Sequence, residues 1–244
     1  MASAASDKTV EPPKGRGSGY SSPSILERRH RILKEARKMI AHGGIANLSM
    51  DEISRRAGVA KRTLYNAFQN KERLIAAAIQ EYFEDYASRI SYSTREATLE
   101  RALERLVVVA RRNLAIKNYT GALMNIYYSH DADPEIRQTI HDIVAESHTP
   151  LIRNLAQKRQ LQSWADPDET IDSLTRMRYA IAHAWAEGMI PDNEFVTRLA
   201  RGFLTYLAGV TRGVARRQVD EMLKELDALP VMNGLLAEQA NDQR

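Results

Sequence analysis

The chain of 244 residues contains no cysteine. This absence excludes disulfides, thiolate nucleophiles and zinc sites with cysteine ligands, and it suits a reducing compartment. No apolar run approaches the roughly 18–20 residues that a membrane helix needs. The N-terminal segment also lacks the apolar core of a signal peptide. We therefore expect a cytoplasmic protein that does not contact a membrane.

The sequence also has few residues that interrupt helices, since it contains only 12 glycines and 8 prolines. Apolar residues recur at spacings of three and four through most of the chain, which is typical of amphipathic helices. Hydrophobic residues make up 43% of the composition, enough for a sizeable core. The pattern predicts an all-α protein.

Signatures of catalysis are missing as well. The chain shows no glycine-rich phosphate loop, no nucleophile elbow and no convincing pair of carboxylates. His183 and Glu187 are four residues apart and could share a metal ion, but two ligands make a poor site. A salt pair along one helix is the simpler interpretation. We expect no catalytic residue, no metal and no cofactor.

Positive charge is concentrated in one block of the chain. Residues 24–73 carry 12 basic and 5 acidic groups, a net charge of +7, whereas residues 74–244 carry a net charge of −4. A basic block attracts a polyanion, and phosphate contacts supply most non-specific affinity for DNA. A basic solvated surface is the alternative interpretation.

The most informative pattern lies within this basic block, over residues 48–74. Ser49 with Glu52 forms a capping box at the start of a predicted helix that ends near Gly58, the expected positive-φ turn residue. A second helix is predicted over residues 61–68, and Asn70 is expected to cap the next one. A helix, a tight turn and a short helix with basic and aromatic residues predict a helix-turn-helix DNA-binding unit.

These residues resemble the DNA-binding domain of the TetR family of bacterial transcriptional repressors. The resemblance covers about residues 32–74. It is strongest in the following residues: Ile53, Ala57, Gly58, Val59, Thr63, Leu64, Tyr65, Phe68, Lys71 and Glu72. The resemblance implies a homodimer, residues 61–68 as the recognition helix, and a C-terminal helical domain that binds a small effector.

The predicted contacts to double-stranded DNA follow from this resemblance. Two positions depart from the family pattern: Ala60 stands where a serine usually caps the recognition helix, and Arg62 where a small residue is common. Arg62 could instead pair with a guanine. Tyr65 could alternatively be a half-buried packing residue. The predicted DNA-contacting residues are Ser49, Arg56, Lys61, Arg62, Thr63, Tyr65, Asn66 and Lys71.

The organisation of the rest of the chain is less sharply defined. We expect a disordered arm over residues 1–23, whose basic residues could touch DNA, and the helix-turn-helix domain over 24–73, its first helix capped by Ser24. A helical effector-binding and dimerisation domain should span 74–229, followed by a tail over 230–244. We expect a sixth helix to follow Gly121.

Two surfaces are expected in this larger domain. By family resemblance, the dimer would form a four-helix bundle, unless the same residues only fill the core of one chain. Those residues are Ile181, Ala184, Trp185, Phe195, Leu199, Phe203 and Leu207. The candidate effector contacts combine apolar surface with polar tips, although each could equally be a plain core residue. They are Tyr82, Tyr86, Met124, Tyr127, Tyr128, His141, Met177 and Trp185.

The sequence therefore predicts a homodimeric repressor that binds a palindromic operator and releases it when a small apolar effector binds. Two alternatives remain open. In the first, the helical domain engages a protein partner instead of a small molecule. In the second, the helical domain is an enzyme with a DNA-binding appendage, which would require polar side chains that converge in a cavity.

Overall fold

The computed structural model describes residues 23–45 and 47–232, and this part of the chain is helical with no strand. The all-α prediction is therefore confirmed. The predicted arm lies outside the described residues, apart from Pro23. The helices are α1 (Pro23–Gly43), α2 (Met50–Ala57), α3 (Lys61–Phe68), α4 (Lys71–Ser88), α5 (Leu99–Ala115), α6 (Lys117–Tyr128), α7 (Pro134–Gln157), α8 (Pro167–Ala186), α9 (Asp192–Val210), α10 (Gly213–Lys224) and the short 3-10 helix η1 (Leu226–Ala228).

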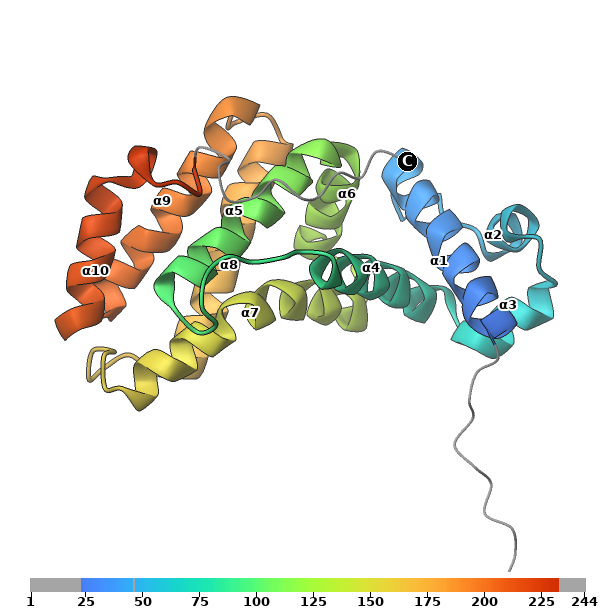
Figure 1. The fold of residues 1–244 in the computed structure, drawn as a ribbon. Coiled ribbons are helices and arrows are strands. Elements are labelled where there is room, and N and C mark those ends of the chain that lie inside the picture. The colour runs from blue at the N-terminus through green and yellow to red at the C-terminus, as the bar shows by residue number, and fades with distance from the viewer. Residues whose placement is uncertain (1–22, 46, 233–244) are drawn as a thin grey trace, which may run out of the picture.

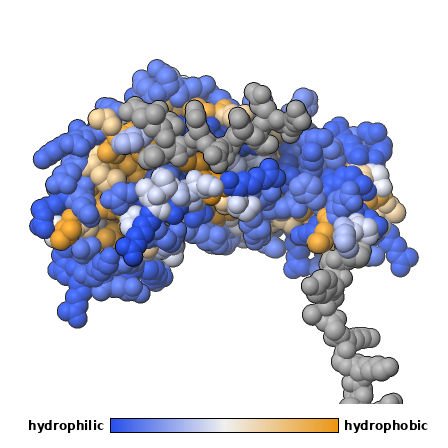
Figure 2. Space-filling view, in the orientation of Figure 1, coloured by the Kyte–Doolittle hydropathy of each residue, from blue (hydrophilic) through white to orange (hydrophobic). Residues whose placement is uncertain are grey.

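The helices form an arched molecule with two unequal parts (Figure 1). Helices α1, α2 and α3 make a small module at one end, and α9 and α10 lie at the opposite end. Helix α4 begins in the small module and runs into the larger part, where it lies beside α7. Hydrophilic residues cover most of the visible surface (Figure 2). The arrangement makes α4 the direct connection between the two parts.

Helix α1 contributes one buried stripe to the small module. Ile32, Leu33, Ala36 and Ile40 are buried at helical spacing, as the periodicity predicts. Ile25, however, is 50% exposed, because neighbouring helices cover α1 only from Ile32 onward.

The start of α1 differs from the prediction. The helix begins with Pro23, which fits the first helical turn because its missing amide would have had no partner there. Ser24 therefore lies inside α1 and is not its cap. The prediction of a capping box at Ser24 is wrong.

The core of the larger part comes from α5 to α10. Trp185 of α8 and Phe195, Phe203 and Leu207 of α9 are completely buried within a single chain, because α8 packs on α9 while α5 and α10 also pack on α9. These side chains, predicted to form the dimer bundle, therefore fill the core of one protomer. Ile181 and Ala184 of the same predicted set are only half-buried, so the prediction that they lie at a dimer interface stays open.

Two further boundaries differ from the sequence predictions. Helix α6 begins at Lys117, so Gly121 lies within the helix and does not precede it. Helix α10 begins at Gly213, whose φ of 63° turns the chain away from α9. Arg111 donates from Nη2 to the carbonyls of Val231 at 3.1 Å and Met232 at 2.7 Å. The first residues of the predicted tail thus pack against α5.

Candidate nucleic-acid interface and ligand cavity

The turn between α2 and α3 has the geometry of a helix-turn-helix unit. Gly58 adopts φ 64° and ψ 41°, a left-handed conformation that is costly for any residue with a Cβ atom. The amide of Gly58 donates to the carbonyl of Arg55, and the amide of Val59 donates to that of Ser54 at 3.0 Å. Val59 itself is only half-buried. The turn therefore supplies hydrogen-bond donors to the last carbonyls of α2 and redirects the chain into α3.

The inner face of α3 fixes the helix to the module. Leu64 and Phe68, four residues apart, are both buried against the core that contains Ile53 of α2. Arg31 of α1 donates from Nε to the carbonyl of Ala57 at 2.9 Å and so holds the C-terminal end of α2. This packing decides which side of α3 faces the solvent.

The predicted recognition residues gather on the opposite face of α3. Lys61, Arg62, Tyr65 and Asn66 are exposed, with 42% of Tyr65 accessible, while Thr63 is half-buried. The structure thus brings these five side chains to one helix, and Tyr65 is not part of the core. An exposed aromatic between cations can contact bases and sugars as well as phosphates.

The basic side chains of this surface differ in whether they already form ion pairs within the chain. Lys61 pairs with Asp51 at 2.6 Å, and Glu52 accepts from both Arg55 and Arg56. These two hydrogen bonds lower the pKa of Glu52 to about 2. Arg62 makes no ion pair or hydrogen bond with any described residue, so it is the most available guanidinium on α3.

Three predicted DNA contacts lie outside α3: Arg56 is exposed in the last turn of α2, and the other two lie at helix starts. Ser49 precedes α2 and is exposed, but its side chain makes no capping hydrogen bond, and the Glu52 carboxylate is taken by Arg55 and Arg56. The predicted capping box at Ser49 is therefore not formed. Lys71 occupies the first turn of α4, where free amides also favour phosphate.

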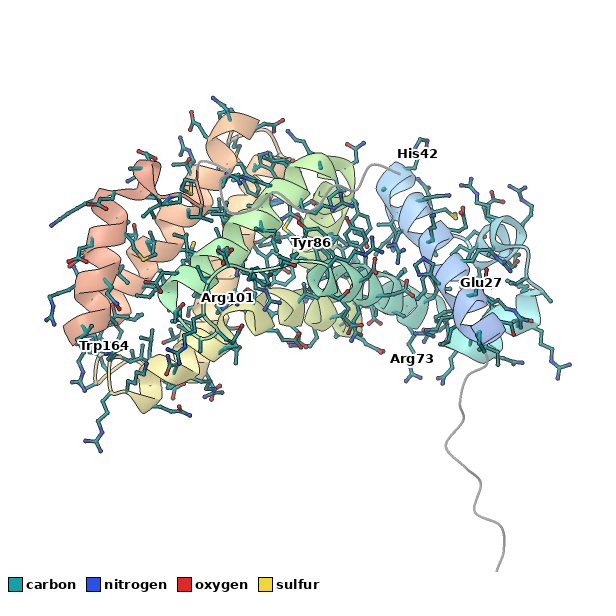
Figure 3. All side chains as sticks on the ribbon, in the orientation of Figure 1. Glu27, His42, Arg73, Tyr86, Arg101 and Trp164 are labelled. Carbon is teal, nitrogen blue, oxygen red and sulfur yellow. The ribbon has the colours of Figure 1, made fainter. Side chains whose placement is uncertain are left out.

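A strained turn separates the recognition helix from α4. Gln69 has φ 67° and ψ −54°, and the amide of Asn70 donates to the carbonyl of Phe68 at 2.8 Å. This is a γ-turn of the rare type with positive φ. The side chain of Asn70 then caps α4 by accepting from the amide of Arg73 at 2.8 Å, as predicted. Arg73 lies at this junction in Figure 3.

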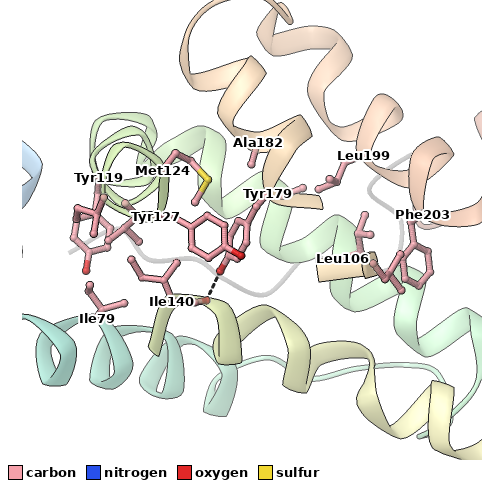
Figure 4. Close-up of a cluster of buried hydrophobic side chains, with 14 of the residues drawn as sticks. Ile79, Leu106, Tyr119, Met124, Tyr127, Ile140, Tyr179, Ala182, Leu199 and Phe203 are labelled. Atoms are coloured by element: carbon pink, nitrogen blue, oxygen red, sulfur yellow. Dashed lines mark hydrogen bonds between the residues drawn. The ribbon is translucent and has the colours of Figure 1, made fainter. Parts of the chain in front are cut away.

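An internal cavity of about 70 Å³ lies in the larger part of the molecule, between α4, α5, α6, α7 and α8. Its wall is mainly apolar and includes Phe83, Leu123, Ile140 and Val144. Figure 4 shows Tyr179 of α8 reaching toward α7, where its hydroxyl donates to the carbonyl of Ile140. The space exceeds that of a single water molecule several times. It is a candidate site for a small ligand.

Only two of the predicted effector residues line this cavity. Tyr86 of α4 and Met124 of α6 are part of its wall, and Tyr86 points into the middle of the molecule (Figure 3). Burial raises the pKa of Tyr86 to about 12, so its hydroxyl stays protonated. Its hydroxyl lies 3.4 Å from the carbonyl of Val108.

The other six predicted effector residues are engaged elsewhere. Their partners are polar groups or rings of neighbouring helices. Tyr82 accepts from Arg112, Tyr127 bonds His141 at 2.9 Å, Tyr128 packs on His183, Met177 lies against Gly202, and Trp185 stacks on Phe195. His183 thus meets an aromatic ring, where the sequence favoured a salt pair with Glu187.

The sequence analysis did not identify the polar residues of the cavity wall. Tyr92, Asn113, Thr120 and Arg178 all line the cavity, and each has a buried side-chain atom without a hydrogen-bond partner among the described residues. Arg178 could have been found, because it lies on the apolar stripe of α8, four residues after Leu174 and four before Ala182. A charged residue on a buried stripe is unusual and calls for an explanation.

The described residues contain no helix long and apolar enough to span a membrane. Within the same ranges, no group of three or more histidine, aspartate or glutamate side chains is placed to hold a metal ion.

A helix-turn-helix module with an exposed basic recognition helix, joined to a helical domain with a cavity, defines a class of DNA-binding proteins. Residues 32–78 match the family model described as "Bacterial regulatory proteins, tetR family". This match assigns the helix-turn-helix module to the TetR family.

Curated relatives of this chain have related roles. The Fatty acid metabolism regulator protein of Bacillus subtilis is 25% identical over 113 residues, which are 46% of this chain and 58% of that protein. The transcriptional activator FasR of Mycolicibacterium smegmatis is 34% identical over 84 residues, or 34% and 38% of the two lengths. The transcriptional repressor KstR of Rhodococcus jostii is 26% identical over 70% of this chain and 74% of its own. The first two matches thus span less than two thirds of those relatives.

Solved structures agree on the fold. A TetR-family regulator from Rhodococcus sp. superposes with a TM-score of 0.58 at 20% identity, covering 74% of this chain and 98% of the other. One from Streptomyces coelicolor gives a TM-score of 0.56 at 20% identity, with coverages of 84% and 90%. The fold therefore extends through both parts of the molecule.

Proposed function

We propose that this chain is a cytoplasmic, effector-responsive transcriptional repressor. It binds a palindromic operator as a homodimer through α3, and it releases the operator when a small, largely apolar molecule occupies the cavity. The family membership supports the DNA-binding role. Relatives named as activator and as repressor both occur, so the direction of regulation is part of the proposal.

The observation that carries the proposal is the course of α4. Its first turn follows the recognition helix, and its last turns supply Phe83, Tyr86 and Ala87 to the cavity wall. Arg37 of α1 pairs with Glu81 of α4 at 2.7 Å and so links the DNA-binding module to the middle of this helix. A ligand that displaces the far end of α4 would move the module.

Release follows from linkage between two binding equilibria. An effector shifts the protein away from DNA only if it binds the DNA-incompetent arrangement more tightly. The two recognition helices of a dimer must reach half-sites about one helical turn of DNA apart, so a small displacement is enough to lose the operator. The presence of a cavity supports a small-molecule effector over a protein partner.

The test is selection of bound duplexes from a random DNA pool by the purified full-length protein at physiological salt. We expect enrichment of a palindrome with half-sites about one helical turn apart. Sedimentation of the complex would give the number of chains per site. Binding without an enriched motif, which simply weakens as salt rises, would contradict a sequence-specific regulator and favour the interaction-protein alternative.

A further inference from the structure

The cavity wall includes a buried cation that has no acidic partner among the described residues. Arg178 is 6% exposed, and its Nη1 donates to Ser147 Oγ at 2.6 Å and to His148 Nδ1 at 3.2 Å. His148 is neutral, because burial and the charge of Arg178 lower its pKa to about 3, so its Nδ1 can accept while Nε2 faces the carbonyl of Ile171 at 3.1 Å. Both partners of the guanidinium are therefore uncharged.

Arg178 lines the cavity, and one of its donors has no acceptor in the described part of the chain. Its Nε is buried and has no hydrogen-bond partner among the described residues. Burial and repulsion from Arg105, which lines the same cavity, lower the pKa of Arg178 to about 10, and the guanidinium stays charged at neutral pH. A buried charge without a counter-ion is costly, and an anion would offset that cost.

Nearby acidic groups do not fill this role. Glu104 is buried on α5, but its carboxylate accepts hydrogen bonds from the backbone and side chains of Ser93 and Thr94. Asp172 on α8 is held by Arg176 at 2.7 Å. Among the described residues, therefore, no carboxylate pairs with Arg178, whose printed partners are Ser147 and His148.

Two hydroxyl groups strengthen the same point. The buried hydroxyls of Tyr92 and Thr120 line the cavity and have no hydrogen-bond partner among the described residues. Together with Nε of Arg178, they give three unused donors around an apolar space. Buried donors are rarely left unsatisfied, so this arrangement is typical of a site that receives an acceptor from a ligand.

We propose that the effector is a monocarboxylic acid with an apolar body, whose carboxylate binds Arg178 inside the cavity. The assignment rests on the proposed function and specifies its ligand. The Nε edge of a guanidinium matches the two oxygens of a carboxylate, and the apolar wall receives the rest of the molecule. Tyr92 and Thr120 supply the secondary hydrogen bonds.

The surroundings of the cavity favour a single negative charge. A surface depression of about 190 Å³ shares Phe83, Ala87, Arg105 and Ile143 with the cavity. The lining of this depression also includes the carboxylates of Glu84, Asp142 and Glu146. Three carboxylates beside the cavity repel a ligand that bears several phosphates more strongly than one that bears a single carboxylate.

The test compares acids with neutral molecules of the same shape. Calorimetry on the full-length protein would use hexanoate, octanoate, decanoate, cyclohexanecarboxylate and benzoate, each beside its alcohol and its primary amide. We expect at least one acid to bind about tenfold or more tightly than its neutral counterparts, because only the acid forms the charged hydrogen bonds. Equal affinities within every set, or no binding by any acid, would overturn the proposal.

Variants identify the group responsible. Arg178→Gln should remove the preference for the acid and leave the affinity for the alcohol, and Arg178→Lys should keep part of it. Arg176→Gln is the matched control, because Arg176 lies two positions away on α8 but pairs with Asp172 outside the cavity. If Arg178 variants fail to fold, Arg105→Gln, at a half-buried position, should weaken acid binding severalfold. An undiminished preference in the folded variants contradicts the proposal.

Failure of this assignment can be told apart from failure of the proposed function. Operator selection needs no ligand, so an enriched palindrome with no acid preference would retain the regulator and reject the carboxylic acid. Calorimetry needs no DNA, so acid binding without an operator would do the reverse.

Discussion

The two parts of the molecule use arginine in opposite ways. On α3, Arg62 is exposed and free of partners in the described chain, and water solvates its charge at little cost. On α8, Arg178 is buried and donates only to neutral groups. The first suits a large polyanion outside the protein, and the second suits a small anion inside it. Stability and function should therefore separate in the DNA-binding module and be coupled in the larger domain.

The largest effect is expected in the core of the larger domain. Trp185→Ala should lower the free energy of unfolding by about 3–5 kcal/mol, because the side chain is completely buried and stacks on Phe195. Urea unfolding measures this loss. Trp164→Ala is the matched control, because Trp164 is 69% exposed and should change stability by no more than about 0.5 kcal/mol. Similar losses for both would contradict the assigned core.

Substitutions on the recognition helix should affect DNA binding and leave stability unchanged. Tyr65→Ala and Arg62→Ala should each weaken operator binding by about 1–3 kcal/mol while the melting temperature stays nearly unchanged, since both side chains are exposed. Fluorescence anisotropy with the selected duplex measures the affinity. Arg198→Ala, in an exposed ion pair with Glu194 on α9, should leave it unchanged. A loss of folding with Tyr65→Ala would assign this residue to the core.

The neutral state of His148 predicts a dependence of stability on pH. Because its pKa falls from an unfolded value of 6.5 to about 3, the unfolded chain binds a proton that the folded chain does not bind in this range. Stability is therefore complete above pH 6.5 and declines as pH falls toward 3, with a slope of at most about 1.4 kcal/mol per pH unit.

Urea unfolding between about pH 5 and pH 6.5 tests this slope. His148→Asn should flatten it, whereas His42→Asn, at an exposed position, should leave it intact. A slope that survives in His148→Asn would show that other groups cause it.

The smallest effects are expected at the two turns that flank α3. Gly58→Ala should lower the free energy of unfolding by about 1–2 kcal/mol, because a residue with a Cβ atom is strained at a φ of 64°. No atom lies within 4 Å of the new Cβ, so a clash adds nothing to this cost. Gln69→Gly should instead raise stability by up to about 1 kcal/mol through relief of its positive φ, less what is lost with the hydrogen bond from Arg73. Thermal unfolding of the two variants measures both changes in stability. Changes in the same direction would contradict the predicted difference between the two turns.

The structure of the DNA-binding module could be predicted from the sequence because the signals that determine it are local. Gly58, Leu64, Phe68 and Asn70 each occupy the place that their spacing predicts, since turn chemistry and a period of three to four residues decide them. The predicted capping box at Ser24 was wrong because α1 already begins at Pro23. The one at Ser49 was wrong because Ser49 makes no capping hydrogen bond and Glu52 pairs with Arg55 and Arg56.

The cavity was predicted poorly because it depends on five helices at once. Tyrosine, methionine and tryptophan suggest a pocket and a core equally well, and Tyr127 and Trp185, both predicted as effector contacts, contact His141 and Phe195 and do not line the cavity. Tertiary packing decides whether such a side chain meets a space or a neighbour. Arg178 carried the more useful signal, which was a charge at an apolar position of α8.

Trp185 also gives this protein an optical property. The chain has two tryptophans, one exposed in the turn before α8 and one in a dry environment on α8 itself. The indole of Trp185 donates to Asp192 Oδ1 at 2.8 Å, and Lys117 of α6 reaches the same oxygen at 2.5 Å. Replacing Trp164 by phenylalanine would leave one emitter at the junction of α6, α8 and α9. Its fluorescence would then follow movements of these three helices relative to one another without any added label.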